Sequence, residues 1–170
     1  MVAINPDTVI IATGSHPRSK PIPGDGSIHV ISPIDAMKSP EVHTGKKAII
    51  VDEVAHFPAY APAEALMDAG AKVTILTHKF FIGSLLDQAT MVRTLRRLAT
   101  KGIEMNPNTA VISITGGHLQ LRDTLSGLER TESADVVVAA VGNKVTDGLV
   151  QETAGVFKNL KIRVVGDASA

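Results

Sequence analysis

The apolar positions of this chain form short continuous runs separated by polar or glycine-rich segments. Residues 47–51, 72–77 and 134–142 are such runs, rich in Val, Ile and Ala. Runs of this length and composition are typical of strands that are buried on both faces of a parallel sheet. Two further runs, at 7–12 and 161–167, have the same character. All five are therefore predicted to be buried strands.

Helical spacing occurs between several of these runs. Residues 59–69 and 87–101 are predicted helices, and Gly102 is a stop signal for the second one. Residues 33–38 and 147–155 predict a helical turn and a short helix. The alternation of buried strands with helices indicates βαβ units.

A different pattern follows the second long helix. Residues 110–114 and 118–123 flank Thr115-Gly116-Gly117, which is a hairpin signal, and a third strand is expected near 126–130. The predicted fold class is α/β, a Rossmann-like three-layer sandwich with a parallel sheet and a β-meander. The outer runs lie outside that unit, so we interpret them as flanking strands of a second sheet whose remainder is not in this chain.

Two connecting segments complete the chain. Residues 28–32 predict a short strand, and residues 15–26, with three prolines and two glycines, predict an irregular connection.

Composition narrows the function classes. Seventeen basic residues balance seventeen acidic ones, and there is no Trp and one Tyr, so no nucleic-acid partner is expected. No run is long enough for a membrane span, and the N-terminus lacks signal-peptide features, so no membrane partner and a cytoplasmic location are expected.

Metal, thiol and hydrolase chemistry have no support in the sequence. The absence of Cys excludes disulfides and iron–sulfur ligation by this chain itself. The six histidines show no metal-ligand spacing and no G-x-S-x-G motif occurs, so no metal site and no catalytic residue are predicted.

The order of landmarks resembles that of two-domain pyridine-nucleotide–disulfide oxidoreductases. Ala12-Thr13-Gly14 follows the first strand, a βαβ unit and the run at 134–142 come next, and Gly166-Asp167 ends the last strand. In that family a nucleotide domain is inserted into an FAD-type domain.

The resemblance implies three segments. Residues 1–40 are an FAD-domain strand and connection, 41–158 a Rossmann-like NAD(P)-binding-type domain, and 159–170 the return strand of the FAD-type domain. It also implies that Ala12, Thr13, Gly14, Gly166 and Asp167 lie near the FAD or ADP pyrophosphate. Without the resemblance, the local sequence at Gly166-Asp167 indicates only the end of a strand followed by a turn.

The turn after the strand 47–51 resembles a narrower group. Asp52-Glu53, Ala55-His56-Phe57 and Ala63-Glu64-Ala65-Leu66 are similar to the degenerate turn of trimethylamine dehydrogenase-like flavoproteins. That resemblance implies a parent enzyme with FMN in a barrel, an iron–sulfur cluster and electron transfer to an electron-transfer flavoprotein. 2,4-Dienoyl-CoA reductases share the architecture but keep a working NADPH site.

The same turn lacks what a dinucleotide site needs. A G-x-G-x-x-G turn uses its glycines for a tight bend and for close approach of backbone N–H groups to the pyrophosphate. Residues 52–68 contain no glycine, and Pro58 and Pro62 each remove a backbone donor. Asp52 and Glu53 add negative charge, and each like-charge pair at about 4 Å is unfavourable by roughly 1 kcal/mol in water. We expect no NAD(P)H binding in the usual pose.

The end of the run at 72–77 carries Thr77-His78-Lys79 where an NAD site has Asp or Glu for the ribose. His78 and Lys79 suit a 2′-phosphate, or an adenine nucleotide that avoids the turn. Such residues are more often simply solvated loop residues. His56, inside the turn, is expected to hydrogen-bond Asp52 or Glu53.

The leading hypothesis is an excised, nucleotide-incompetent Rossmann-like domain of an FMN- and iron–sulfur-dependent amine dehydrogenase-type oxidoreductase. In isolation it is expected to show no catalysis and to hold no cofactor, and its partners are the remainder of the parent flavoenzyme and an electron-transfer flavoprotein. One alternative is the NAD(P)H-binding domain of a 2,4-dienoyl-CoA reductase-like enzyme. Another is a non-catalytic scaffold or docking surface for the barrel or for an electron acceptor. Arg93, Arg96 and Arg97 suit an acidic partner, but such residues more often form a solvated face that also covers apolar surface.

Overall fold

The computed structural model describes residues 6–18, 22–156 and 161–169. The chain divides into two compact units, one formed by residues 1–18 and 143–170 and the other by residues 19–142. No helix among the described residues is long and apolar enough to span a membrane.

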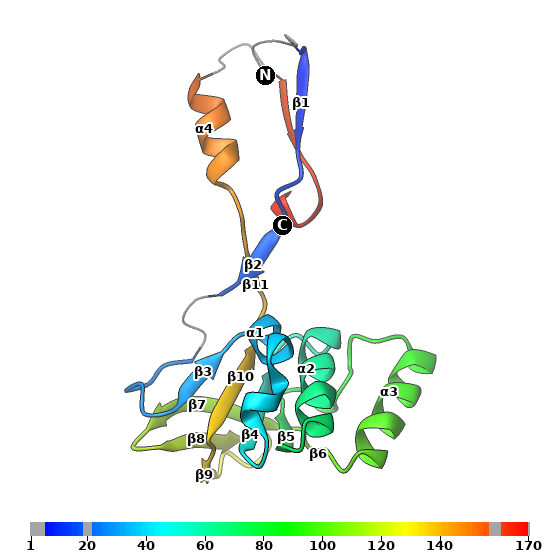
Figure 1. The fold of residues 1–170 in the computed structure, drawn as a ribbon, viewed down its shortest axis with the longest axis vertical. Helices are drawn as coiled ribbons and strands as arrows, with labels where there is room; N and C mark the ends of the chain where they lie inside the picture. Colours follow the sequence, from blue (N-terminus) through cyan, green and yellow to red (C-terminus); the bar gives the residue numbers. More distant parts are fainter. Residues whose placement is uncertain (1–5, 19–21, 157–160, 170) are drawn as a thin grey trace. The chain divides into compact units, whose positions relative to one another are not determined.

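The larger unit is built on a five-stranded parallel sheet (Figure 1). In spatial order its strands are β3 (His29–Ile31), β10 (Val136–Ala140), β4 (Lys47–Asp52), β5 (Lys72–Leu76) and β6 (Glu104–Asn106). The three apolar runs predicted as buried strands are β4, β5 and β10, and every residue of β10 is buried.

One face of this sheet carries helices. They are α1 (Pro33–Lys38), α2 (Phe57–Asp68) and α3 (Gln88–Thr100), with a single 3₁₀ turn, η1 (Pro40–His43), after α1. Asp87 caps α3 by accepting a hydrogen bond from the Thr90 N–H at 3.0 Å.

The other face carries the predicted meander, formed by β7 (Thr109–Thr115), β8 (His118–Asp123) and β9 (Glu129–Ser133). Both turn glycines between β7 and β8 have positive φ, 58° and 77°, which confirms the hairpin signal. The third strand starts three residues later than expected, because the Asp123 side chain accepts the Ser126 N–H at 2.7 Å and holds residues 123–127 in a turn.

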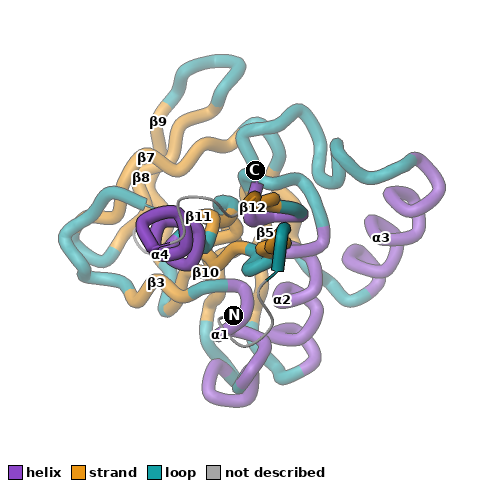
Figure 2. The backbone as a smooth tube through the Cα atoms, turned by 90° about the horizontal axis from the view of Figure 1, so that it is seen from above, coloured by secondary structure: helices purple, strands orange, loops and turns teal. Residues whose placement is uncertain are grey.

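Alternation along the central strand explains the three layers. Ala48 and Ile50 of β4 pack in the cluster that includes the helices, whereas Ile49 and Val51 pack in the cluster that includes the meander. Figure 2 shows the same arrangement from above, with α1 to α3 and the meander around the sheet. The predicted Rossmann-like three-layer α/β fold is confirmed.

The segment before β3 is more ordered than an irregular connection. Gly24 forms a bridge with Ile114 of β7. The Asp25 carboxylate accepts the N–H groups of Gly116 at 2.8 Å and Ser27 at 2.9 Å, and hydrogen bonds from Ser27 and Gly116 lower the pKa of Asp25 to about 2. This segment is therefore fixed to the meander.

The smaller unit contains two pairs of strands. β1 (Thr8–Ile11) and β12 (Lys161–Val164) are parallel, and β2 (Ser15–Pro17) and β11 (Asn143–Val145) are antiparallel. It also contains α4 (Gly148–Val156) and a 3₁₀ turn, η2 (Gly166–Ser169).

Two expectations for the smaller unit are wrong. The strands β1 and β12 were predicted to be buried, but Ile10 is 66% exposed and only Ile11 of β1 is buried, because the pair has no further strand beside it among the described residues. Residues 15–17 were predicted as irregular, but they form β2 by pairing with β11.

The compact units also differ from the segments that the resemblance implied. β3 and α1 fall within residues 1–40 of the sequence but belong to the larger unit, because β3 pairs with β10. β11 and α4 fall within residues 41–158 but belong to the smaller unit.

Candidate functional site

The turn that joins β4 to α2 is the position of a dinucleotide site in this fold. Ala55, at its centre, has φ of 51° and is fully buried. A positive φ is the conformation that glycine adopts without strain, so the backbone keeps a glycine-like geometry while the residue carries a Cβ. The side chain of Ala55 therefore occupies space that a glycine would leave open.

The Asp52 carboxylate organises this turn from within. It is fully buried; its Oδ1 accepts the Ala55 N–H at 2.7 Å, and its Oδ2 accepts the Tyr60 hydroxyl at 2.9 Å. The Tyr60 oxygen in turn accepts the Gly83 N–H at 2.7 Å. The turn, α2 and the loop after β5 are thus joined by one buried chain of hydrogen bonds.

Burial also shifts the pKa values of Asp52 and Tyr60. Removal from water raises the pKa of the Asp52 carboxyl above its ordinary value, although hydrogen bonds from Tyr60 and Ala55 oppose the shift. Burial and the neighbouring Asp52 charge raise the pKa of Tyr60, so its hydroxyl remains a donor.

His56 does not have the role that was expected for it. It is exposed at the N-cap of α2, its side chain makes no capping hydrogen bond, and its ring contacts the Phe57 ring edge-on at 4.9 Å. The hydrogen bond to Asp52 that was expected from His56 comes instead from Tyr60. Glu53, unlike Asp52, is exposed.

Thr77, His78 and Lys79 lie beyond the end of β5, as predicted. Thr77 is buried, with its Oγ1 accepting the Lys79 N–H at 3.3 Å, whereas His78 is exposed. His78 lines a cavity of about 120 Å³ together with Asp52 and Glu53. The remaining lining residues are Val51, Leu76, Thr109, Ala110 and Val111. This volume is far below the pockets that hold drug-sized ligands, about 300–1,000 Å³.

The smaller unit brings together the two motifs predicted near a flavin or ADP. Ala12-Thr13-Gly14 and Gly166-Asp167 both follow the parallel pair β1 and β12, and the Ser15 hydroxyl next to Gly14 donates to Asp167 Oδ2 at 3.3 Å. Gly14 and Gly166 have φ of 68° and 64°, and no described atom lies within 4 Å of a Cβ built on either. The backbone here is open to close approach, which fits the pyrophosphate of FAD or ADP.

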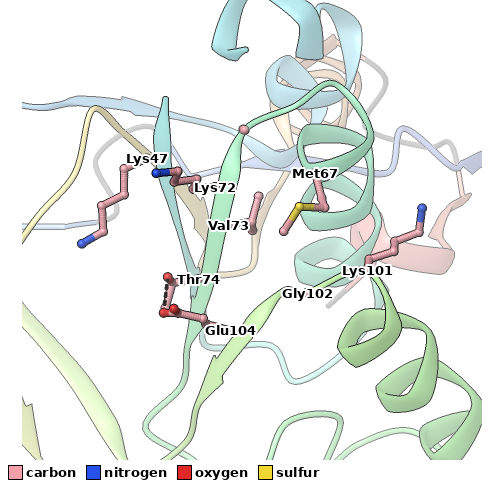
Figure 3. A pocket seen from close by; sticks show the side chains of 9 residues that line it. Lys47, Met67, Lys72, Val73, Thr74, Lys101, Gly102 and Glu104 are labelled. Carbon is pink, nitrogen blue, oxygen red and sulfur yellow. Dashed lines mark hydrogen bonds between the residues drawn. The ribbon is translucent and has the colours of Figure 1, made fainter. Parts of the chain in front are cut away.

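A separate cavity of about 410 Å³ lies at the amino-terminal ends of β5 and β6 (Figure 3). Met67 and Val73 line it, Thr74 Oγ1 donates to Glu104 Oε2 at 3.1 Å, and the Lys101 side chain extends away from the strands. No predicted site residue lies here.

Residues 2–168 match the pyridine nucleotide-disulphide oxidoreductase family. The chain belongs to this family. The superfamily-level resemblance and the oxidoreductase character of the relatives are thereby confirmed, and flavin binding is a property of the family.

Individual relatives of the family are amine-oxidising enzymes. The N,N-dimethylglycine/sarcosine dehydrogenase of Chromohalobacter salexigens is 30% identical over 114 residues, which are 64% of this chain and 16% of that protein. The chain therefore spans about a sixth of the length of this curated relative.

Two solved structures of amine-oxidising enzymes share the fold. Histamine dehydrogenase from Rhizobium sp. 4-9 is 24% identical with a TM-score of 0.86, covering 96% of this chain and 28% of that one. The 6-hydroxypseudooxynicotine amine oxidase of Pseudomonas geniculata N1 is 26% identical with a TM-score of 0.84, covering 98% and 27%.

Sequence reasoning missed Tyr60 and Gly83. The one signal for Tyr60 is that it is the only tyrosine of the chain and lies in a helix rich in Ala and Pro. A buried tyrosine hydroxyl needs a hydrogen-bond partner. Gly83 could not be identified from the sequence as the donor to this hydroxyl, because it lies 23 residues after Tyr60.

Proposed function

We propose that this chain is the Rossmann-like domain of a flavin-dependent amine dehydrogenase-type oxidoreductase, and that it does not bind NAD(P)H. In this proposal FMN and an iron–sulfur cluster lie in other parts of a longer protein. Electrons from the oxidised amine leave to an electron-transfer flavoprotein, so no nicotinamide is needed.

The observation that carries the proposal is the closed turn between β4 and α2. Its central residue, Ala55, carries a Cβ at a φ of 51°, and the Ala55 N–H already donates a hydrogen bond to Asp52. Pro58 has no N–H to offer in the first turn of α2. A pyrophosphate needs free N–H groups and close approach at this place, so the residues present do not fit a pyridine nucleotide.

The amine substrate class is supported by the relatives. The curated relative is named for N,N-dimethylglycine and sarcosine, and the two structures for histamine and for an amine oxidase. All three names describe oxidation of an amine. We therefore propose that the longer protein oxidises an amine, and we assign it no particular substrate.

The smaller unit suits a contribution to a flavin or ADP site. Thr13 donates to the Thr146 carbonyl at 2.6 Å, and this fixes the segment before Gly14. Gly14, Gly166 and Asp167 would hold the sugar-phosphate part of the ligand. Because β1 and β12 lack neighbouring strands among the described residues, we expect no flavin in the isolated chain.

Titration of the purified domain with NADPH and NADH by calorimetry tests the proposal. We expect no saturable heat up to millimolar nucleotide, and micromolar binding to either would overturn it. In the full-length protein, we expect a flavin absorbance that is bleached by a small amine and not by NADPH. Bleaching by NADPH alone would support a reductase.

One observation favours the alternative function, an NAD(P)H-binding domain of a reductase. His78 is exposed beyond the end of β5 and lines a cavity, and Lys79 is adjacent, so the two could take a 2′-phosphate without use of the turn. If so, NADPH should bind the domain more tightly than NADH, and the variant His78→Gln should remove the difference.

A further inference from the structure

The buried carboxylate of Asp52 accepts hydrogen bonds from the Ala55 N–H and the Tyr60 hydroxyl. We propose that Asp52 is a resident anion of the turn between β4 and α2, and that this internal carboxylate excludes phosphate-bearing ligands. The inference rests on the proposed function, because it names one residue that contributes to the missing nucleotide affinity.

The donor set is that of a built anion site. The Ala55 N–H lies 2.7 Å from Oδ1, and the Tyr60 O–H lies 2.9 Å from Oδ2. The Gly83 N–H donates to the Tyr60 oxygen at 2.7 Å, which orients the hydroxyl proton toward the carboxylate. Backbone N–H groups beside a helix N-terminus are the donors that bind phosphates in other proteins. Here both carboxylate oxygens are satisfied by the chain itself.

In its ionised form Asp52 accepts both of these hydrogen bonds. An ionised group is retained in a protein interior when its hydrogen bonds are complete. Burial has the largest effect and raises the pKa of Asp52, whereas the hydrogen bonds from Tyr60 and Ala55 and, less strongly, the nearby His78 lower it. Removal of the carboxylate would leave the Ala55 N–H and the Tyr60 hydroxyl buried without their acceptor.

The adjoining cavity limits what could replace the carboxylate. Its volume is about 120 Å³, and Asp52 forms part of its wall. A variant without the Asp52 side chain would therefore admit a small carboxylate such as formate or acetate. A dinucleotide would still be too large, and Pro58 and the Ala55 methyl group would remain.

Thermal unfolding of Asp52→Ala in formate, acetate and chloride at equal ionic strength tests the proposal. We expect the variant to have a lower Tm than wild type in chloride, and formate or acetate to raise its Tm in a saturable way. Wild type should show no such increase. The double variant Asp52→Ala/Tyr60→Phe, which lacks one donor, should respond less. A folded Asp52→Ala protein with no carboxylate-specific increase would overturn the proposal.

A second measurement uses the wild-type protein, in case Asp52→Ala does not fold. In a pH titration followed by amide NMR, the Ala55 and Gly83 signals should shift together, with one midpoint above the ordinary Asp value of 3.8. The Gly102 amide, at the end of α3, is the control. Glu53→Gln and His78→Gln variants separate the contributions of the two other titratable side chains that line the cavity. Independent or absent shifts at Ala55 and Gly83 would contradict a shared resident anion.

The two proposals fail in different ways. NADPH binding to the wild-type domain overturns the proposed function, regardless of whether formate raises the Tm of Asp52→Ala. Absence of both the formate response and the shared titration leaves the proposed function standing, and assigns the exclusion to the Ala55 methyl group and Pro58.

Discussion

The two units of this chain differ in how completely each buries its own strands. In the larger unit, β4 and β10 are covered on both faces, and residues such as Ile49, Ile50 and Val137 are fully buried. In the smaller unit, the buried side chains among the described residues are Ile11, Thr153 and Ala168. The first unit has a core of its own, and the second has strands without one.

This difference shows what apolar composition does and does not determine. Both strands are mainly apolar: β1 consists of Thr, Val and Ile, and β10 consists of Val and Ala. Yet Ile10 of β1 is 66% exposed, whereas Val138 of β10 is not exposed at all. A strand is buried only when other elements cover it, and a two-stranded sheet offers too little surface. In the longer protein that we propose, the exposed side chains of β1 are expected to be covered.

Truncation of one isoleucine in each unit should give the largest contrast. Ile50→Ala opens a cavity between β4 and the helices and is expected to cost about 2–5 kcal/mol of unfolding free energy. Ile10→Ala removes an exposed side chain and should change it by less than about 0.5 kcal/mol. Urea unfolding followed by circular dichroism measures both. Equal losses would contradict the view that only the larger unit has a complete core.

A glycine in each unit gives a second, smaller contrast. A Cβ at Gly24 would stand 2.7 Å from the Ile114 carbonyl oxygen, whereas none of the described atoms lies within 4 Å of one at Gly148. We expect Gly24→Ala to destabilise the larger unit by about 1–3 kcal/mol. Gly148→Ala, at the start of α4, should cause no loss. Thermal unfolding of the two variants checks this, and a harmless Gly24→Ala would mean that the segment before β3 is free to move away from β7.

The same contrast explains how much could be predicted from the sequence. β4, β5 and β10 are long apolar runs, and Gly116-Gly117 marks the hairpin, so the larger unit was largely predictable. β2 and β11 have three residues each and no apolar alternation, so only their mutual pairing defines them. Burial of the outer strands could not be judged from their apolar composition, because it depends on which elements cover them.

The candidate site was predictable only in part. The lack of glycine in the turn was visible, but the positive φ of Ala55 and the buried position of Asp52 were not. Asp52 and Glu53 are adjacent acids with the same predicted role, yet one points into the protein and the other is exposed. The difference comes from Tyr60, whose hydroxyl reaches Asp52 only once α2 has formed.

Lowering the pH should reduce the stability of the larger unit through His43. This residue is buried, and burial, with the nearby Lys46 and His29, lowers its pKa below the ordinary 6.5. Because the unfolded chain binds this proton more readily, the contribution is complete above about pH 6.5 and is lost as the pH falls through the lowered pKa. His43→Leu should flatten the dependence of Tm on pH between 5 and 7, which lies around the ordinary His value of about 6.5. His56→Gln, at an exposed site, is the control, and an unchanged slope in His43→Leu would contradict the assignment.

The smallest expected effect concerns the ion pairs that join the helices of the larger unit. Arg97 Nε lies 2.8 Å from Glu64 Oε1 and connects α3 to α2, whereas no ion pair is found within the described part of the smaller unit. In the scaffold alternative Arg97 is one of three arginines that meet an acidic partner, but this pair already engages it. Arg97→Gln should therefore cost about 0.2–1 kcal/mol, less at high salt, because the pair is partly exposed. Arg93→Gln, on the same helix with no ion pair among the described residues, should be close to neutral, and urea unfolding at low and high salt would distinguish them. An equal, salt-independent loss in both variants would show that the arginines act through their aliphatic stems instead of through charge.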